Sequence, residues 1–179
     1  MSLYSDVRTA IRKVCLTALS EYPTAEVIFS HNNGLETVGS YAVINILSIE
    51  QQGHHSTSTL TRETEQTLSI QVPYEVFVQV SFVGSLSGEM SQSFSQRINN
   101  NFKVFEDLSR NNLGVMRKSQ IRRAPQKRDT KWVEYHNIDV TFSYTGLTRD
   151  SVDLIEAVVV ENVAADNTFR VPEGPIPNF

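Results

Sequence analysis

One stretch of the sequence, residues 68 to 82, alternates between apolar and polar side chains. Every even position is apolar and most odd positions are polar; the apolar residues are Leu68, Ile70, Val72, Tyr74, Val76, Val78, Val80 and Phe82. This period of two predicts a β-strand with one face on a core and the other facing water or a partner. Because Pro73 cannot donate a ladder hydrogen bond, the stretch predicts one of two structures. They are two strands in line, broken near Pro73, or one long ribbon that projects from the body to contact something else.

The segments on either side follow two other periodicities. Apolar residues at spacings of three and four predict an amphipathic helix over residues 3 to 19, which ends at Tyr22-Pro23. A similar spacing predicts a second helix, with Glu89 in its first turn, whose large aromatic face covers the sheet. The residues on that face are Met90, Phe94, Ile98, Phe102 or Asn101, Phe105 and Leu108.

The remaining apolar segments predict further strands. A short strand at 27–29 precedes a turn at 31–34, and residues 41–49 are apolar on both faces, with Asn45 in need of a hydrogen-bond partner. On the strand at 41–49, Leu47 and Ile49 are expected on the side of Tyr41, and Ile46 on the side of Ala42. Later strands are expected at 115–123, at 138–144 with Gly146 as its end, and at 152–163. The order predicts an α+β domain: a mostly antiparallel β-sheet with two main helices packed on one face and a long β-hairpin.

The expected domain covers residues 1–163, and residues 164–179 form an extended, proline-containing C-terminal arm. That arm is either disordered or lies on a neighbouring molecule. Residues 51–66 are polar, and they form either the tip of the long hairpin or a flexible loop.

Basic residues are concentrated in one part of the chain. Residues 117 to 131 hold seven of the sixteen Lys and Arg residues and one acid; the seven are Arg117, Lys118, Arg122, Arg123, Lys127, Arg128 and Lys131. From residue 134 onward there are eight acids and two bases. The basic stretch indicates contact with phosphate or with an acidic surface of another subunit, or else a solvated loop. No aromatic residues interleave with it, so base stacking is not expected.

The sequence contains no motif of an enzyme or of a cofactor site. It lacks a phosphate-binding loop and a Gly-x-Ser-x-Gly elbow, and Cys15 falls on the buried side of a predicted helix. His54 and His55 are adjacent, so on a strand they point to opposite faces and chelate a metal poorly. His31 and His136 are isolated in the sequence. We therefore expect no enzymatic activity, no metal and no cofactor. No signal peptide or membrane-spanning run is expected either, which makes the cytosol the natural compartment of synthesis.

Four segments together resemble the neck or tail terminator proteins of tailed bacteriophages, over residues 3 to 160. They are Ser40-Tyr41-Ala42-Val43-Ile44-Asn45-Ile46-Leu47-Ser48, Leu113-Gly114-Val115, the run from Trp132 to Tyr144, and Val152-Asp153-Leu154-Ile155-Glu156. The resemblance implies a non-enzymatic structural protein of the virion, made in the host cytoplasm. Such proteins form a ring, usually of six copies, at the head-proximal end of the tail tube. The ring stops tube growth and docks the head–tail connector, and the genomic DNA passes through it. The implied partners are the tail tube protein, the connector or stopper protein and possibly the sheath protein, without a membrane.

Two groups of residues are candidate contacts in such a ring. The hairpin group would contact an adjacent subunit or a neighbouring ring, and comprises Gly53, His54, His55, Ser56, Thr57, Ser58 and Thr59. The basic stretch 117–131 would face acidic segments of a neighbour or the DNA channel. Three alternatives remain open from the sequence: a head-completion or other tail-ring subunit, a nucleic-acid-binding module that uses the basic stretch, and a small metal-dependent enzyme that uses His54 and His55.

Overall fold

The computed structural model describes residues 3–31, 39–62, 65–128 and 130–152. A seven-stranded sheet has the order β1-β2-β4-β9-β5, with β3 paired to β4 and β6 paired to β9, and β7 and β8 form a separate two-stranded sheet. The strands are β1 Glu26–Phe29, β2 Tyr41–Gln51, β3 Ser56–Arg62, β4 Glu65–Val83, β5 Leu113–Lys118, β6 Arg122–Arg123, β7 Gln126–Arg128, β8 Lys131–Val133 and β9 Tyr135–Val152. Among the described strands, only β1 and β2 pair in parallel, so the predicted α+β fold with a mostly antiparallel sheet is confirmed.

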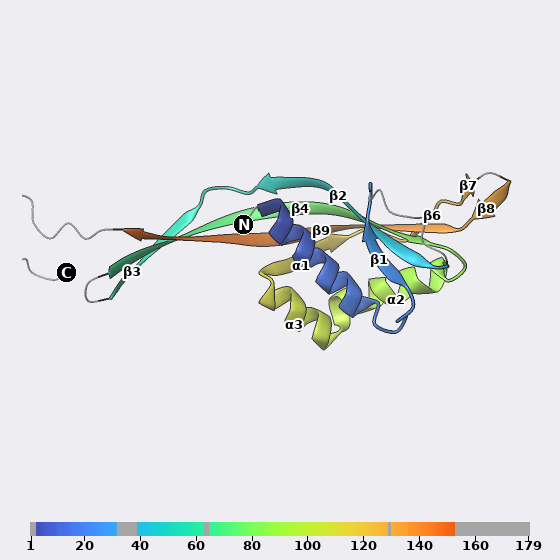
Figure 1. Ribbon diagram of the computed structural model, residues 1–179, viewed down its shortest axis with the longest axis horizontal. Helices are drawn as coiled ribbons and strands as arrows, with labels where there is room; N and C mark the ends of the chain where they lie inside the picture. Colours follow the sequence, from blue (N-terminus) through green and yellow to red (C-terminus); the bar gives the residue numbers. More distant parts are fainter. Residues whose placement is uncertain (1–2, 32–38, 63–64, 129, 153–179) are drawn as a thin grey trace, which may run out of the picture.

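Two long strands, β4 and β9, run the length of the molecule (Figure 1) and pair without interruption from Gln66–Val152 to Val83–Tyr135. The ribbon predicted from residues 68 to 82 is therefore one strand, and the alternative of two strands broken near Pro73 is wrong. The carbonyl of Pro73 accepts a hydrogen bond from the Gln52 amide at 2.9 Å. Pro73 therefore turns its backbone toward the link between β2 and β3, where the ladder is interrupted and no amide donor is needed.

Three helices cover one face of this sheet (Figure 1): α1 Leu3–Ala18, α2 Ser87–Asn100 and α3 Phe102–Arg110. Their buried residues join the even-numbered residues 76–82 of β4 in one core cluster, which includes Ile11, Val14, Phe82, Phe94 and Leu108. Among the described residues, no helix is long and apolar enough to cross a membrane.

The predicted second helix is divided in two. Asn101 has an extended backbone (φ −100°, ψ 125°), and its side-chain oxygen accepts hydrogen bonds from the amides of Lys103 and Val104 at 3.0 and 3.3 Å. Asn101 therefore ends α2 and caps α3, because an asparagine side chain satisfies the free amides of a first helical turn. The new helix turns its aromatic residues outward, with Phe102 79% and Phe105 67% exposed. The prediction that both phenylalanines face the core is wrong.

Two predicted details of the strands are also wrong. A bulge in β2 between Ile46 and Ser48 leaves Leu47 exposed, so Ile49 joins Ile46 against the core instead of lying on the side of Tyr41. Gly146 does not end β9, which continues to Val152; a Cβ at Gly146 would lie 3.1 Å from the Tyr74 ring, and glycine leaves room for that ring.

Two other predictions from the sequence, for Asn45 and Cys15, can be compared with the structure. Asn45 accepts the hydrogen bond that it needs from the Ser30 hydroxyl, at 2.8 Å. Cys15 is buried in α1, and this burial raises the pKa of its thiol to about 12. The expected turn at 31–34, apart from His31, lies outside the described residues, as do the strand expected at 152–163, apart from Val152, and the C-terminal arm expected at 164–179.

Candidate assembly interface

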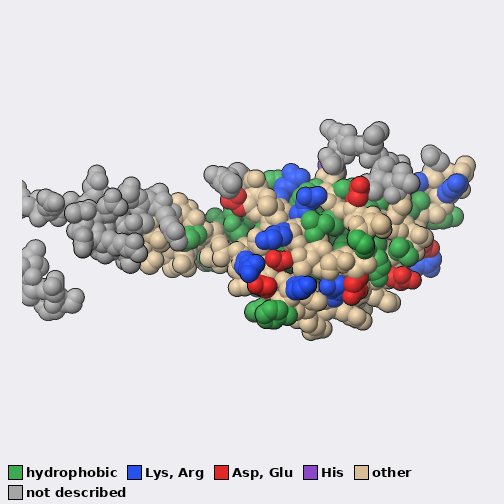
Figure 2. Space-filling view, turned by 60° about the horizontal axis from the view of Figure 1, so that its bottom comes forward, with side chains coloured by type: hydrophobic (Ala, Val, Ile, Leu, Met, Phe, Trp, Pro, Cys, Tyr) green, Lys and Arg blue, Asp and Glu red, His purple; other side chains and the backbone are tan. Residues whose placement is uncertain are grey.

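A three-stranded extension of the sheet consists of β3, residues 65–72 of β4 and residues 146–152 of β9. From here on, the arm means this extension and not the C-terminal arm expected at 164–179. It reaches well beyond the helices (Figure 1), and in the space-filling view it leaves the rounded body as a slender projection (Figure 2). Of the polar residues 51–66, Ser56–Arg62 form β3, which pairs with β4 beyond the end of β2, so the alternative of a flexible loop is wrong for these described residues. The predicted hairpin group lies here: Gly53, His54 and His55 are in the link before β3, and Ser56, Thr57, Ser58 and Thr59 are on β3.

The arm carries apolar side chains that no helix of the described chain covers (Figure 1). Leu68, Ile70 and Val72 lie on the same face of β4 as the buried Val76, but they are only half-buried because no helix lies over them (Figure 1). The outer edges of β3 and of the arm portion of β9 have no paired strand among the described residues. Open strand edges and an uncovered apolar face are the features through which sheets bind other chains.

The seven basic residues do not form one patch. Lys118 points toward α2, where its ammonium donates hydrogen bonds to the backbone and hydroxyl oxygens of Ser95. Arg117 lies on the opposite face of the sheet, where it pairs with Glu75 at 3.3 Å and stacks over the Phe77 ring at 5.4 Å.

The next two arginines also pair within the chain, Arg122 with Asp139 and Arg123 with Glu134. Sequence reasoning missed these carboxylate partners. Both acids lie close to the basic stretch in sequence, but the pairs depend on the register between β6 and β9, which residue spacing alone does not give.

The last three basic residues belong to the β7–β8 hairpin, at the end of the molecule opposite the arm (Figure 1). Lys127, Arg128 and Lys131 are exposed there, together with Trp132, whose side chain is 70% exposed. Arg128 lies over the Tyr135 ring at 5.5 Å. The sequence left this segment as a possible solvated loop; the structure shows a hairpin that carries three exposed basic residues.

The Arg123–Glu134 pair makes a testable electrostatic prediction. The Arg123 guanidinium donates two hydrogen bonds to the Glu134 carboxylate and lowers the pKa of that carboxyl below its ordinary value. Because the pKa of Glu134 is lower in the folded state than in the unfolded chain, the ion pair stabilises the fold at pH values above the unfolded pKa. This stabilisation is lost as the pH falls through the folded pKa. We expect Arg123→Gln to raise the pKa of Glu134 toward its ordinary value, as measured by an NMR pH titration. Arg122→Gln, which removes the partner of Asp139 instead, is the control, and equal effects of the two substitutions would contradict the assignment.

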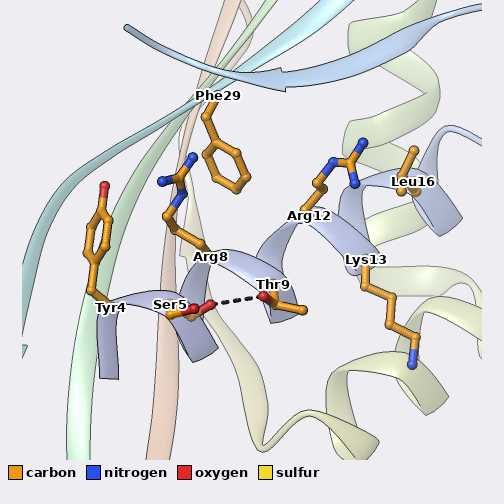
Figure 3. Close-up of a pocket in the computed structure, with 8 residues that line it drawn as sticks. All are labelled: Tyr4, Ser5, Arg8, Thr9, Arg12, Lys13, Leu16 and Phe29. Atoms are coloured by element: carbon orange, nitrogen blue, oxygen red, sulfur yellow. Dashed lines mark hydrogen bonds between the residues drawn. The ribbon is translucent and has the colours of Figure 1, made fainter. Parts of the chain in front are cut away.

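A groove that the sequence did not single out runs along the exposed side of α1. It has a volume of about 550 Å³ and is lined by Tyr4, Ser5, Arg8, Thr9, Arg12, Lys13, Leu16 and Phe29. Figure 3 shows Arg8 beneath the Phe29 side chain of β1, with Tyr4 on its other side, while Lys13 points away. The Arg8 guanidinium lies 4.2 Å from the centre of the Phe29 ring and 5.6 Å from that of Tyr4.

Two pairs of side chains among the described residues resemble parts of an enzyme or metal site: Ser87 with His136, and His54 with His55. The Ser87 hydroxyl lies 3.0 Å from Nδ1 of His136, so that histidine is not isolated as the sequence suggested. Ser87 is buried at the first turn of α2, where a substrate has no access to its hydroxyl. No three His, Cys, Asp or Glu side chains of the described residues come together as metal ligands, and His54 and His55 are exposed in the link before β3.

Comparison with known families identifies the class of this chain. Residues 1–169 match the model of the phage neck terminator protein family, so the chain belongs to that family and the resemblance noted in the sequence is confirmed. The family is one of structural phage neck proteins. No curated protein matches the chain.

Two solved structures are similar over most of the chain. One, known only by a sequence identifier, is 14% identical with a TM-score of 0.37, covering 80% of this chain and 95% of its own. The other belongs to the virion of a native gene transfer agent particle and is 10% identical with a TM-score of 0.26, covering 81% of this chain and 91% of its own. TM-scores of this size carry no conclusion about fold or function.

Proposed function

We propose that this chain is the terminator at the neck of a tailed phage, and that its copies close into a ring on the head-proximal end of the tail tube. The ring, of six copies, stops growth of the tube and gives the head–tail connector a docking surface, while the genomic DNA passes through its centre. The direct partners are then the tail tube protein and the connector, and in a contractile tail the sheath protein.

The observation that supports a ring is the apolar face of the arm, which no helix covers. Its apolar residues Leu68, Ile70 and Val72 continue the core face of β4 past the last helix. Burying such a face against a neighbour stabilises association by roughly 25 cal/mol for each Å² of apolar surface removed from water. In a closed ring every subunit supplies an arm and receives one, so no arm remains bare.

The cations of the β7–β8 hairpin have a place in the same proposal. Lys127 and Lys131 are exposed at the end of the molecule that lies farthest from the arm (Figure 1). They face either an acidic segment of a neighbour or the DNA in the channel. In either case their contribution weakens as salt rises, because exposed charges are screened beyond about 8 Å at physiological ionic strength.

The proposal is tested by measuring mass and end-capping together. Light scattering after size exclusion distinguishes one chain of 20.2 kDa from a closed oligomer near six times that mass. The same protein is mixed with tail tubes, and capped ends are counted by electron microscopy. We expect a closed oligomer, either free or on the tube end. Wild-type protein that neither oligomerises nor caps tubes would contradict the terminator role.

Two variants test whether the apolar face of the arm, and not another part of the surface, forms the interface between subunits. The double substitution Ile70→Thr and Val72→Thr keeps β-branched side chains on the strand but removes apolar surface. We expect it to weaken association by about tenfold or more, since each 1.4 kcal/mol of lost binding energy is a factor of ten. Leu147→Thr, on the other face of the arm, is the matched control. Normal capping by the double variant would show that this face of the arm is not an interface.

A further inference from the structure

We propose that the α1 groove binds the acidic C-terminal segment, residues 153–179, of a neighbouring copy. The proposal rests on the ring proposed above, because it needs a second copy of the chain within reach. It assigns a role to a surface and to a segment that the ring proposal leaves unused.

The groove carries two guanidinium groups without a carboxylate partner. Five other arginines each pair with an acid of the same chain: Arg97, Arg110, Arg117, Arg122 and Arg123. Among the described residues, Arg8 and Arg12 have no such pair; Arg12 donates from Nε to the Val27 carbonyl at 3.3 Å, and Arg8 contacts only aromatic rings. A guanidinium that lies over an aromatic ring leaves its N–H edges open, and those edges match a carboxylate.

Beside these cations the groove also has aromatic and apolar side chains. Tyr4 and Leu16 stand exposed on α1, and Phe29 lies beside them on β1. A second hollow of about 500 Å³ shares Tyr4, Arg8 and Phe29 and continues the groove toward the β1–β2 edge of the sheet. A ligand for this surface therefore needs carboxylates and apolar side chains along one stretch of chain.

The segment 153–179 has this composition. It contains five acids, Asp153, Glu156, Glu161, Asp166 and Glu173, against the single base Arg170. Between the first three acids lie apolar residues, Leu154, Ile155, Ala157, Val158, Val159 and Val160. Its charge and its apolar content both complement the groove.

The path of β9 favours the groove of a neighbour. Asp6, in the first turn of α1, is close enough to Tyr144 that its charge adds to burial in raising the pKa of the Tyr144 phenol. From Tyr144 the strand runs eight residues outward to Val152, a distance of about 26 Å at 3.3 Å per residue. β9 therefore ends at the outer end of the arm, away from the α1 groove of its own chain (Figure 1).

Cross-linking between two full-length variants tests the contact. Thr9→Cys places a thiol in the groove, and Ala157→Cys and Ala164→Cys place one in the segment; the native Cys15 is buried and does not compete. The variants are mixed, assembled alone or on tail tubes, and treated with a short bis-maleimide. We expect a covalent pair of chains from the Thr9→Cys mixture with at least one of the segment variants.

Charge reversal tests the recognition itself. Arg8→Glu with Arg12→Glu is expected to lower the yield of cross-linked pairs by about tenfold, and lysines at Asp153, Glu156 and Glu161 of the partner variant are expected to restore it. Lys103→Glu, an exposed charge reversal on α3, is the matched control and leaves the yield unchanged.

The outcomes separate the two proposals because the mass of each mixture is measured as well. An oligomer without the covalent pair overturns the groove proposal and leaves the ring. So does a cross-link that forms only within one chain when Thr9→Cys and Ala157→Cys are combined in the same polypeptide. A yield that is insensitive to charge reversal also overturns it. The absence of any oligomer, alone or on tubes, overturns both proposals.

Discussion

Replacing Phe94 by alanine is expected to lower the free energy of unfolding by about 3–5 kcal/mol, the usual cost of removing a buried phenylalanine. Phe94 is fully buried on α2, and its ring lies 5.4 Å from that of Phe82 on β4, tilted by 55°. The pair joins the helical layer to the central strand. Its loss leaves a cavity that the surrounding strands cannot close, and it removes a large share of a typical stability of about 5–15 kcal/mol.

Urea denaturation followed by circular dichroism measures this change. The midpoint should fall while the dependence on denaturant stays the same, because the surface exposed on unfolding hardly changes. Phe105→Ala is the matched control: the same substitution at a side chain that is 67% exposed is expected to change stability by less than about 0.5 kcal/mol. Equal effects at the two positions would contradict the division of the predicted helix at Asn101.

These two phenylalanines also show what the sequence could predict. Phe94 and Phe105 fit one helical pattern with Met90, Ile98 and Leu108. The pattern correctly placed helical structure over the sheet. It could not show that Asn101 breaks the helix, because asparagine is tolerated inside helices and becomes a cap only where the chain turns. The break depends on how α2 and α3 both fit the same sheet.

For the strands, too, the local pattern predicted the element but not the details that depend on its neighbours. The alternation from Leu68 to Phe82 was enough to predict a half-buried strand, since each residue obeys the period independently. The place of Pro73 could not be predicted, because it depends on where β2 stops and β3 starts on the neighbouring side. The bulge at Leu47 likewise arises from pairing and not from local sequence.

Less of the candidate interface could be predicted. The polar stretch 51–66 pointed to a hairpin, and its position on the arm follows from the pairing of β3 with β4. The charge count of residues 117–131 suggested one basic surface, but the register with β9 pairs Arg122 and Arg123 with acids of the same chain. The α1 groove combines residues of α1 with Phe29 of the following strand, and the periodicity of each segment does not show that the two lie side by side.

The second large effect is expected at Gly84, between β4 and α2. Its φ of +102° belongs to a region that only glycine adopts easily. A Cβ there would lie 2.8 Å from the Gly39 carbonyl oxygen and 2.9 Å from the Ser40 Cα, both backbone atoms. That backbone is held in turn, since the Ser40 hydroxyl accepts the Leu86 amide at 3.1 Å and Gly84 donates to the Glu134 carbonyl at 3.1 Å.

We therefore expect Gly84→Ala to lower the free energy of unfolding by about 2–5 kcal/mol, from backbone strain together with a collision that the surroundings cannot relieve. Gly53→Ala separates the two causes. Gly53 also has a positive φ, +68°, but no atom lies within 4 Å of its added Cβ, so only the cost of a left-handed residue, about 1–2 kcal/mol, applies. The difference between the two variants in urea denaturation measures the collision together with the extra strain of a φ of +102° over one of +68°. A difference near zero would mean that the Ser40 backbone moves to make room for the added Cβ. The junction of β4, α2 and β2 would then not be rigid enough to fix the position of α2.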